Sequence, residues 1–399
     1  MIHAGVHSTS FRQGQEDLKK LAEMDISEQR IARATKRIGQ ERVTEREAEK
    51  EAWEKLPLPE QQRGNPTEQV PEVACVEMDG GRIQIRDRKA AAETCKTNDN
   101  CWRKGRFWRE SKVGCLLSMV SSESQQDPCP EIPEVFVNPA RMSRISREIK
   151  GFGVEEEAAE SDESKSQQSK SSKRPGQPEV LVRNVVATRE NIDAFGKQLA
   201  AAAWQHGFAA AKRKAFVGDG MEANWTVWRK YFSHYTPILD FIHAICYVFA
   251  AAMAGRSMAE AWPIYCEWAQ WIWSGQVEKV IAALQRRQQV LGPPGENEPE
   301  ESPRQKVAEA LRYLGNQKSR MRYDQYRRCG LPITSSHIES TIKQINRRVK
   351  GSEKFWSTGG AEALLQLAAD HLSETDPLKR FWQHRQHHTT GHRHYCTAL

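Results

Sequence analysis

The sequence contains 399 residues, of which 28% are charged, and its formal net charge is +7. A chain of this length has room for two or three domains. It shows no apolar core of a signal peptide, and the apolar run after His243 ends at Gly255, which is too short to cross a bilayer. Nine cysteines are scattered without a C-x-x-C pair, which is typical of reduced thiols. These features argue against a secreted or membrane-spanning protein and predict a cytoplasmic one without membrane partners.

The first 60 residues predict a helical segment after an unstructured start at 1–10. Apolar spacing predicts a helix over 14–24, and Ser27 is a candidate N-cap for a second helix that continues to Lys55. A helix, a tight turn and a basic helix are the outline of a helix-turn-helix, whose second helix enters a major groove. A plain pair of antiparallel helices fits equally well. The basic residues expected on the outer side of the second helix are Arg30, Arg33, Lys36 and Arg37.

A first α/β part is expected at 70–153, after a polar linker. Residues 73–86 predict a β-hairpin that turns at Gly80-Gly81, with Asp79 at the end of its first strand. Further strand pattern at 106–120 predicts an antiparallel meander. Residues 154–178 are low in complexity and charged, and we expect them to form a disordered linker.

A second α/β part is expected at 179–239. An Ala-rich helix over 189–211 leads to a short apolar strand that delivers Asp219 between two glycines. Chemistry in α/β folds is often placed at the end of a buried strand, although the same tripeptide is also common in surface turns. Trp225 follows in an amphipathic segment and is expected to pack the fold, with stacking on a flipped base as the alternative.

Residues 240–329 predict an all-α block. Apolar residues recur every three or four positions over 240–254, 257–273, 276–290 and 303–316, and a loop rich in Pro, Gly and Glu lies at 292–303. Asp240 and His243 are three residues apart at the start of the first of these helices, so they share one face.

The region 330–380 predicts a helix that carries Glu339 in its first turn, capped by Ser335 or Ser336. A glutamate in this position can simply complement the helix dipole. Polar and basic residues follow along the same helix and are expected to contact a phosphate backbone: Lys343, Asn346, Arg347, Arg348 and Lys350. A helix over 359–372 and a His-rich tail at 381–399 complete the chain, and the tail is expected either to be solvated or to bind metal.

Three carboxylates therefore come from three predicted elements: Asp79, Asp219 and Glu339. Hard oxygen ligands of this kind suit Mg²⁺ or Mn²⁺ and leave room for substrate phosphates. Two such ions can activate an attacking oxygen and stabilise the leaving one in phosphodiester displacement.

The blocks VEMDGG, FVGDG…NW, ILDFIHA and GLPITSSHIESTIKQINRRVKGSEKFW resemble the bacterial DDE transposases of the ISKra type, which are related to Mutator-like transposases. The resemblance covers about residues 70–395 and implies an RNase H-like catalytic core with a large α-helical insertion between the second and third catalytic carboxylates. It implies that Asp79, Asp219 and Glu339 are metal ligands, and that Asp240 and His243 form an Asp-x-x-His motif beside the active site.

The same resemblance implies Mg²⁺-dependent cleavage of transposon ends and DNA strand transfer, double-stranded DNA as partner, and a homodimer or higher oligomer that joins two ends in the bacterial nucleoid. His243 would donate to the scissile phosphate or to the 3′-oxygen. The chain departs from the family because it lacks Cys-rich, zinc-ribbon-like pairs before the helical segment, which predicts an N-terminally shortened copy. Two other interpretations stay open: a transposase-derived DNA-binding protein without activity, and a metal-dependent nuclease of the RNase H type with another substrate.

Overall fold

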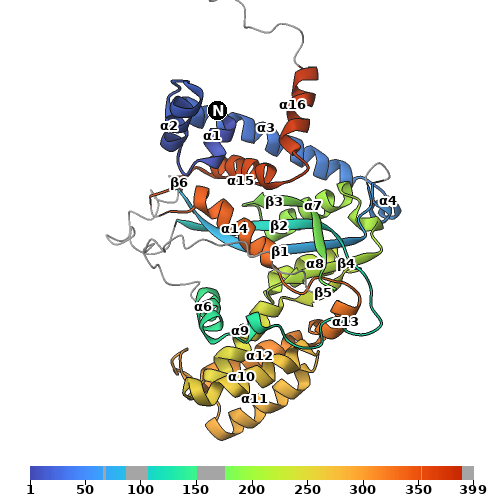
Figure 1. Ribbon diagram of the computed structural model, residues 1–399. Helices are drawn as coiled ribbons and strands as arrows, with labels where there is room; N and C mark the ends of the chain where they lie inside the picture. Colours follow the sequence, from blue (N-terminus) through green and yellow to red (C-terminus); the bar gives the residue numbers. More distant parts are fainter. Residues whose placement is uncertain (66–68, 87–106, 151–175, 352, 389–399) are drawn as a thin grey trace, which may run out of the picture.

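The computed structural model of the protein describes residues 1–65, 69–86, 107–150, 176–351 and 353–388. These residues form a mixed α/β structure with one central sheet surrounded by helices (Figure 1), which confirms the predicted α/β class. The strands are β1 (Val73–Ile85), β2 (Trp108–Val120), β3 (Glu179–Thr188), β4 (Arg213–Gly218), β5 (Thr236–Leu239) and β6 (Phe355–Trp356). The helices of the sheet region and the termini are α1 (Ile2–His7), α2 (Phe11–Ala22), α3 (Glu28–Glu54), α4 (Leu58–Arg63), α6 (Pro139–Lys150), α7 (Ile192–Gln205), α8 (Glu222–Tyr231), α14 (Ser336–Val349), α15 (Thr358–Leu372) and α16 (Pro377–His388).

The sheet runs in the order β3-β2-β1-β4-β5, and the short β6 pairs with the far end of β1. β1, β2 and β3 are antiparallel neighbours, whereas β4 and β5 run parallel to β1. Of the predicted meander over 73–86 and 106–120, the structure contains the antiparallel pair β1 and β2. The chain crosses from β3 to β4 through α7, because two parallel strands need a long connection. β1 occupies the centre, and its run Val73–Val76 is fully buried, as expected of a strand covered on both faces.

The Gly80-Gly81 pair does not turn the chain. β1 continues through both glycines and pairs with β2 from Val73 to Gln84. Neither glycine has the positive φ that a two-residue hairpin turn requires. The hairpin prediction is therefore wrong, and Asp79 lies inside a long strand rather than at its end.

Helices cover both faces of the sheet. The Cys115 thiol of β2 lies 3.3 Å from the Thr341 hydroxyl of α14. The neighbouring Gly114 faces α7, where an added Cβ would come within 2.6 Å of Leu199. Because adjacent residues of a strand point to opposite faces, α14 and α7 lie on opposite sides of the sheet.

The N-terminal helices pack against α15, which lies near the other end of the sequence (Figure 1). At Gly39 of α3 an added Cβ would lie 2.4 Å from the carbonyl oxygen of Ala363, so only glycine permits this approach. Next to it the buried Arg42 donates to both carboxylate oxygens of Asp370, at 2.9 and 3.0 Å. The N-terminal segment is thus part of the main body, and its first residues form α1, so the expectation of an unstructured start is wrong.

The predicted all-α block follows β5 and lies at the end of the molecule opposite α3 (Figure 1). Its helices are α9 (Phe241–Met253), α10 (Met258–Trp273), α11 (Val277–Leu291), α12 (Pro303–Gln317) and α13 (Tyr323–Arg328). The first four match the four predicted helices closely, and α13 is an additional short helix. The ring of Phe241 contacts those of Trp273 and Tyr323, with centroids 5.0 and 5.1 Å apart. This aromatic cluster joins the block to the end of β5, because Tyr323 also donates to the Leu239 carbonyl at 2.9 Å.

Two predictions fall largely or partly outside the described residues. The predicted linker at 154–178 is described only from residue 176, and the His-rich tail is described only to residue 388. The cysteines in the described part of the chain are free, in agreement with the expected reduced thiols. No described helix combines the length and the apolar character needed to cross a membrane.

Candidate functional site

Asp79 and Asp219 lie beside each other where two parallel strands stop pairing. β1 and β4 pair in register as far as Glu77 and Val217, and each aspartate comes two positions later. Glu77 is also opposite Cys115, whose side chain faces α14, so Glu77 and Asp79 point to the α14 side of the sheet. The strand register thus brings two carboxylates from distant parts of the sequence to one level on the sheet.

The two aspartates lie in a poorly solvated place that disfavours their ionised forms. Burial raises the pKa of Asp79, and the charge of Asp219 adds to this effect, so that the pKa reaches about 7. Burial also raises the pKa of Asp219, against the backbone N–H of Met221, which donates to it at 2.9 Å. A cation that binds between such groups offsets both the repulsion between their negative charges and the loss of solvation that burial causes.

The helical block shapes the loop that carries Asp219. Tyr313 of α12 donates its hydroxyl to the Asp219 carbonyl at 2.6 Å. The next residue, Gly220, has φ of +97°, and an added Cβ would lie 2.8 Å from the Tyr313 ring. Asn224 of α8 donates to Asp219 Oδ1 at 2.8 Å and fixes the side chain. Glycine after the aspartate is therefore required by both backbone conformation and space.

Glu339 reaches the same site from the first turn of α14. Its Oε1 is buried and has no hydrogen-bond partner among the described residues. Burial raises its pKa, Asp240 raises it further, and His243 acts in the opposite direction. A buried carboxylate oxygen without a donor is costly unless it finds a proton or a cation, so this atom is a natural ligand position.

Asp240 joins the starts of two helices. It is the N-cap of α9, and its Oδ2 accepts from the His243 backbone N–H at 2.8 Å and lies 2.7 Å from His243 Nδ1. Its Oδ1 accepts from the Ser335 N–H at 2.7 Å, immediately before α14. A fully buried carboxylate with these contacts holds α9 and α14 in a fixed relation.

His243 is a cation in this arrangement at neutral pH. Burial acts to lower its pKa, but the hydrogen bond and charge of Asp240, together with the charges of Asp219 and Glu339, raise it to about 9. Only Nε2 remains for other contacts, because Nδ1 is engaged with Asp240. The predicted shared face of Asp240 and His243 is thus a direct contact.

The five residues singled out in the sequence as a possible active site are brought together. Ligand atoms of Asp240, His243 and Glu339 all lie within 4.8 Å of one another. Asp79 interacts electrostatically with Asp219, His243 and Glu339. The five residues come from four elements: Asp79 from β1, Asp219 from the loop after β4, Asp240 and His243 from the start of α9, and Glu339 from the start of α14.

Glu77 also belongs to the site, although it is not among the residues predicted from the sequence. It is fully buried, its Oε2 accepts from the Ile338 N–H at 2.9 Å, and its Oε1 has no partner among the described residues. Burial raises its pKa to about 8, and the charges of Asp240 and Glu339 contribute in the same direction. The available signal was its position two residues before Asp79, which puts both side chains on one face of a strand.

The donor set fits a hard divalent cation. Carboxylates of Asp79, Asp219 and Glu339 are oxygen ligands of the type that Mg²⁺ and Mn²⁺ take, and several waters or phosphate oxygens would complete their shells. The compact group of Asp240, His243 and Glu339 offers a nitrogen as well, which Mn²⁺ or Zn²⁺ accepts more readily than Mg²⁺. His243 is positively charged beside these groups, so the carboxylates of Asp79, Asp219 and Glu339 remain the best ligands.

The basic face of α14 is only partly as predicted. Lys343, Arg347 and Lys350 are exposed, and Asn346 is half-buried. Arg348 is buried instead: it donates to the carbonyls of Gly5 at 2.9 Å and Thr9 at 3.3 Å. The rings of Phe11 and Trp356 flank its guanidinium at 4.4 and 5.2 Å. The prediction that Arg348 contacts phosphates is therefore wrong, since its position along the helix turns it toward α1.

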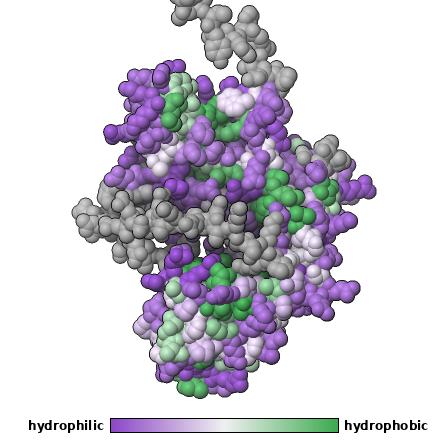
Figure 2. Space-filling view, in the orientation of Figure 1, coloured by the Kyte–Doolittle hydropathy of each residue, from purple (hydrophilic) through white to green (hydrophobic). Residues whose placement is uncertain are grey.

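The predicted basic residues of α3 are all exposed: Arg30, Arg33, Lys36 and Arg37. The opposite side of the helix is buried through Ile31, Thr35 and Ile38. The end of the molecule formed by α2 and α3 is mostly hydrophilic in Figure 2. The structure thus presents these cations on an outer surface, on a helix whose inner side is fixed to the body.

Trp225 packs the fold, as expected. Its side chain is fully buried in α8, and the guanidinium of Arg320 lies 4.2 Å from its ring centroid. Arg320 comes from the short 3₁₀ turn after α12, so this contact attaches the helical block to the sheet region. A buried ring of this kind is not available for stacking on a base.

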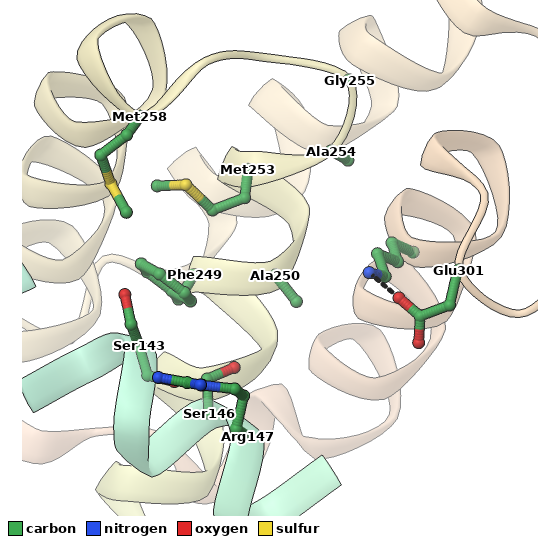
Figure 3. A pocket seen from close by; sticks show the side chains of 11 residues that line it. Ser143, Ser146, Arg147, Phe249, Ala250, Met253, Ala254, Gly255, Met258 and Glu301 are labelled. Atoms are coloured by element: carbon green, nitrogen blue, oxygen red, sulfur yellow. Dashed lines mark hydrogen bonds and ion pairs between the residues drawn. The ribbon is translucent and has the colours of Figure 1, made fainter. Parts of the chain in front are cut away.

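A separate hollow lies between α6, α9 and the loop before α12. Figure 3 shows Ser143, Ser146 and Arg147 of α6 on one side, with Phe249 and Met253 of α9 behind them. Its volume is about 470 Å³. The lining includes none of the carboxylate-site residues, so the hollow is distinct from that site.

Comparison with known proteins does not identify a family for this chain. The chain matches no protein-family model and shows no significant similarity to a curated protein.

Proposed function

We propose that the protein is a DDE-type DNA transposase that uses Mg²⁺, or Mn²⁺ in its place, to cleave transposon ends and transfer the freed strand to target DNA. The proposal combines the resemblance in the sequence with the carboxylate site. In this proposal, the sheet is an RNase H-like core, and the α9–α13 block is the insertion between the second and third carboxylates.

One observation carries the proposal: three carboxylates chosen from the sequence, Asp79, Asp219 and Glu339, meet at one buried place together with Asp240 and His243. These three residues are about 140 and 120 positions apart in the chain, and titratable groups that meet in one place are candidates for a functional site. Burial and mutual repulsion that raise carboxyl pKa values are typical of functional sites, although ion-pair networks in a structural role do the same.

In the proposed mechanism, Asp79, Asp219 and Glu339 would hold the divalent cations. When bound, these cations would supply activation of the attacking oxygen and stabilisation of the leaving one. Asp219 is fixed by the Asn224 amide and the Met221 N–H, and Asp79 by its place in β1, so the chain contributes a preorganised set of ligands.

His243 acts as a hydrogen-bond donor in this proposal. It is protonated at neutral pH, and Asp240 orients its ring through Nδ1. Its Nε2–H would then donate to a phosphate oxygen or to the departing 3′-oxygen as negative charge develops there. Asp240 is a positioning residue, because it acts through His243 and through the Ser335 N–H.

DNA would lie across the exposed cations. Lys343, Arg347 and Lys350 extend from the helix that carries Glu339, so they would contact the backbone near the cleaved bond. The exposed residues of α3 would contact DNA farther away. Joining two ends requires two active sites, so we expect the active complex to be a dimer or a higher oligomer.

The test is cleavage and joining of a labelled duplex that carries the ends of the element around the coding sequence. We expect Mg²⁺-dependent nicking and strand transfer that EDTA abolishes and that Asp219→Asn lowers at least 1,000-fold. The exposed Glu222→Gln is the matched control and is expected to retain activity. Binding without nicking by the wild type would favour an inactive DNA-binding protein, and preferred cleavage of an RNA–DNA hybrid would favour a nuclease.

A further inference from the structure

Three histidines from opposite ends of the sequence meet on the surface, far from the carboxylates in sequence and on other elements. His3 and His7 lie one turn apart on α1, and His371 lies in the last turn of α15. The His7 and His371 rings are linked through Nδ1 and Nε2, which are 2.9 Å apart. The transposase proposal gives these residues no role.

The three imidazoles form a compact cluster. The ring centroids of His3 and His7 are 4.9 Å apart, those of His3 and His371 are 5.1 Å apart, and those of His7 and His371 are 4.9 Å apart. Two histidines at positions i and i+4 on one helix face are a recurrent transition-metal ligand pair. Two nitrogens bound to one tetrahedral Zn²⁺ are about 3.3 Å apart, close to the separation already present between His7 and His371.

The backbone that carries this cluster is fixed independently of the histidines. Arg348 donates to the Gly5 carbonyl at 2.9 Å, and Gly5 packs so closely on α3 that an added Cβ would overlap Thr35. α1 is therefore held between α14 and α3, and its two histidines keep their place beside α15. A site on rigid elements loses little conformational entropy when it binds an ion.

The surroundings of His3 and His371 oppose protonation. Burial lowers the pKa of His3, with His7 acting in the same direction. Burial likewise lowers the pKa of His371, together with His7 and His3. Neutral imidazole is the form that binds a metal, and the proton in the His7–His371 hydrogen bond would have to leave the nitrogen that an ion takes.

We propose that His3, His7 and His371 bind a divalent transition-metal ion, with Zn²⁺ as the best fit, and that this ion clamps α1 to the end of α15. Three nitrogens and one water would complete a tetrahedral shell. As the side chains of the described residues stand, the ligand nitrogens of His3, His7 and His371 do not all lie within 4.8 Å of one another, unlike the ligand atoms of Asp240, His243 and Glu339. Binding therefore requires a rotation of the exposed His3 ring, which its side-chain torsions allow.

The ion would act on the part of the molecule that carries the basic surface of α3. α1 packs against both α3 and α15, so a clamp between α1 and α15 would hold the N-terminal helices on the body. Ion binding to the folded state alone would raise the thermal midpoint in proportion to the logarithm of the free Zn²⁺ concentration. The proposed metal site does not depend on the transposase proposal.

The test is titration of the metal-free, full-length protein with Zn²⁺, followed by calorimetry and thermal unfolding. We expect the wild type to bind one more equivalent than His7→Gln/His371→Gln, and to show a Zn²⁺-dependent rise in thermal midpoint that the double variant lacks. The exposed His234→Gln, in the turn before β5, is the matched control and is expected to behave as wild type. All these proteins keep the histidines of the tail and the carboxylate site, so any Zn²⁺ bound at those places is the same in each and does not affect the comparison.

A single His3→Gln change keeps the proposal testable if the double variant does not fold. His3 is exposed, so we expect unchanged unfolding in EDTA and at least tenfold weaker Zn²⁺ binding. Co²⁺ in the same site should give the intense visible absorption of a tetrahedral ion in the wild type and a weaker one in His3→Gln. Equal stoichiometry, affinity and Co²⁺ spectra in wild type and variants would overturn the proposal.

Discussion

Glu77 offers a sharp test of how the carboxylate site is built, because its carboxyl group is fully buried and its Oε1 has no hydrogen-bond partner among the described residues. We consider Glu77→Gln, which keeps an oxygen to accept the Ile338 N–H but cannot ionise. The wild-type carboxyl has a folded-state pKa of about 8 against an ordinary value of 4.5. A raised pKa means that its stabilising contribution is complete below the ordinary value and is lost as pH rises through the folded value.

The magnitude follows from the two pKa values. Each unit of difference corresponds to about 1.4 kcal/mol. Between about pH 5 and pH 8 the wild type should therefore lose about 3 to 4 kcal/mol of unfolding free energy that Glu77→Gln does not lose. The variant should match the wild type near pH 5 and become progressively more stable than it toward pH 8.

Urea unfolding in EDTA at several pH values measures this difference without bound cations. The exposed Glu222→Gln serves as the control, and its unfolding free energy should follow the wild type at every pH. A stability difference between Glu77→Gln and wild type that does not change with pH would refute the reasoning. Addition of Mg²⁺ should shrink the difference at high pH, since a cation stabilises the ionised site of the wild type.

Three further changes test other parts of the structure. Asp240→Asn should lower the free energy of unfolding by about 3 kcal/mol more below pH 6.5 than above pH 9. The reason is that the raised pKa of His243 stabilises the fold at low pH, and this stabilisation is lost as pH rises through about 9. Urea unfolding at several pH values measures the difference. Gly39→Ala should destabilise by about 1 to 3 kcal/mol by forcing α3 away from α15, as thermal unfolding would show. Arg348→Ala should cost about 2 to 4 kcal/mol through lost hydrogen bonds and ring contacts.

Matched variants separate these effects from general ones. Gly315→Ala in α12 has open space around its Cβ and should gain about 0.5 to 1 kcal/mol, so equal losses at Gly39 and Gly315 would contradict the packing argument. Arg347→Ala is exposed and should leave stability unchanged within about 0.5 kcal/mol while lowering the salt slope of DNA binding by about 1. Equal destabilisation by Arg347→Ala and Arg348→Ala would contradict their different environments. A pH-independent effect of Asp240→Asn would contradict the coupling to His243.

Helices with strong periodicity could be predicted from the sequence. The block over 240–316 shows apolar residues at every third or fourth position, and the structure places α9 to α12 there. The carboxylates that follow or begin recognisable elements, Asp219 and Glu339, were found for the same reason. Local pattern suffices where a helix must bury one face.

The remaining features depend on tertiary contacts that local pattern does not contain. Gly80-Gly81 has the composition of a turn, but pairing with β2 keeps both residues extended. Arg348 looks like its neighbours on a basic helix, and its burial follows from α1, which lies more than 330 residues away in sequence. Glu77 sits in a buried strand where a charged residue is unexpected, and its partner is the backbone of Ile338.

We propose that Asp79, Asp219 and Glu339 form one cation site. Mn²⁺ binding to the metal-free protein, followed by electron paramagnetic resonance, tests it most directly, with Glu339→Gln beside the wild type. We expect the wild type to bind Mn²⁺ and Glu339→Gln to bind it at least tenfold more weakly while remaining folded in EDTA. Equal Mn²⁺ affinity in the two proteins would contradict the shared site and, with it, the proposed chemistry.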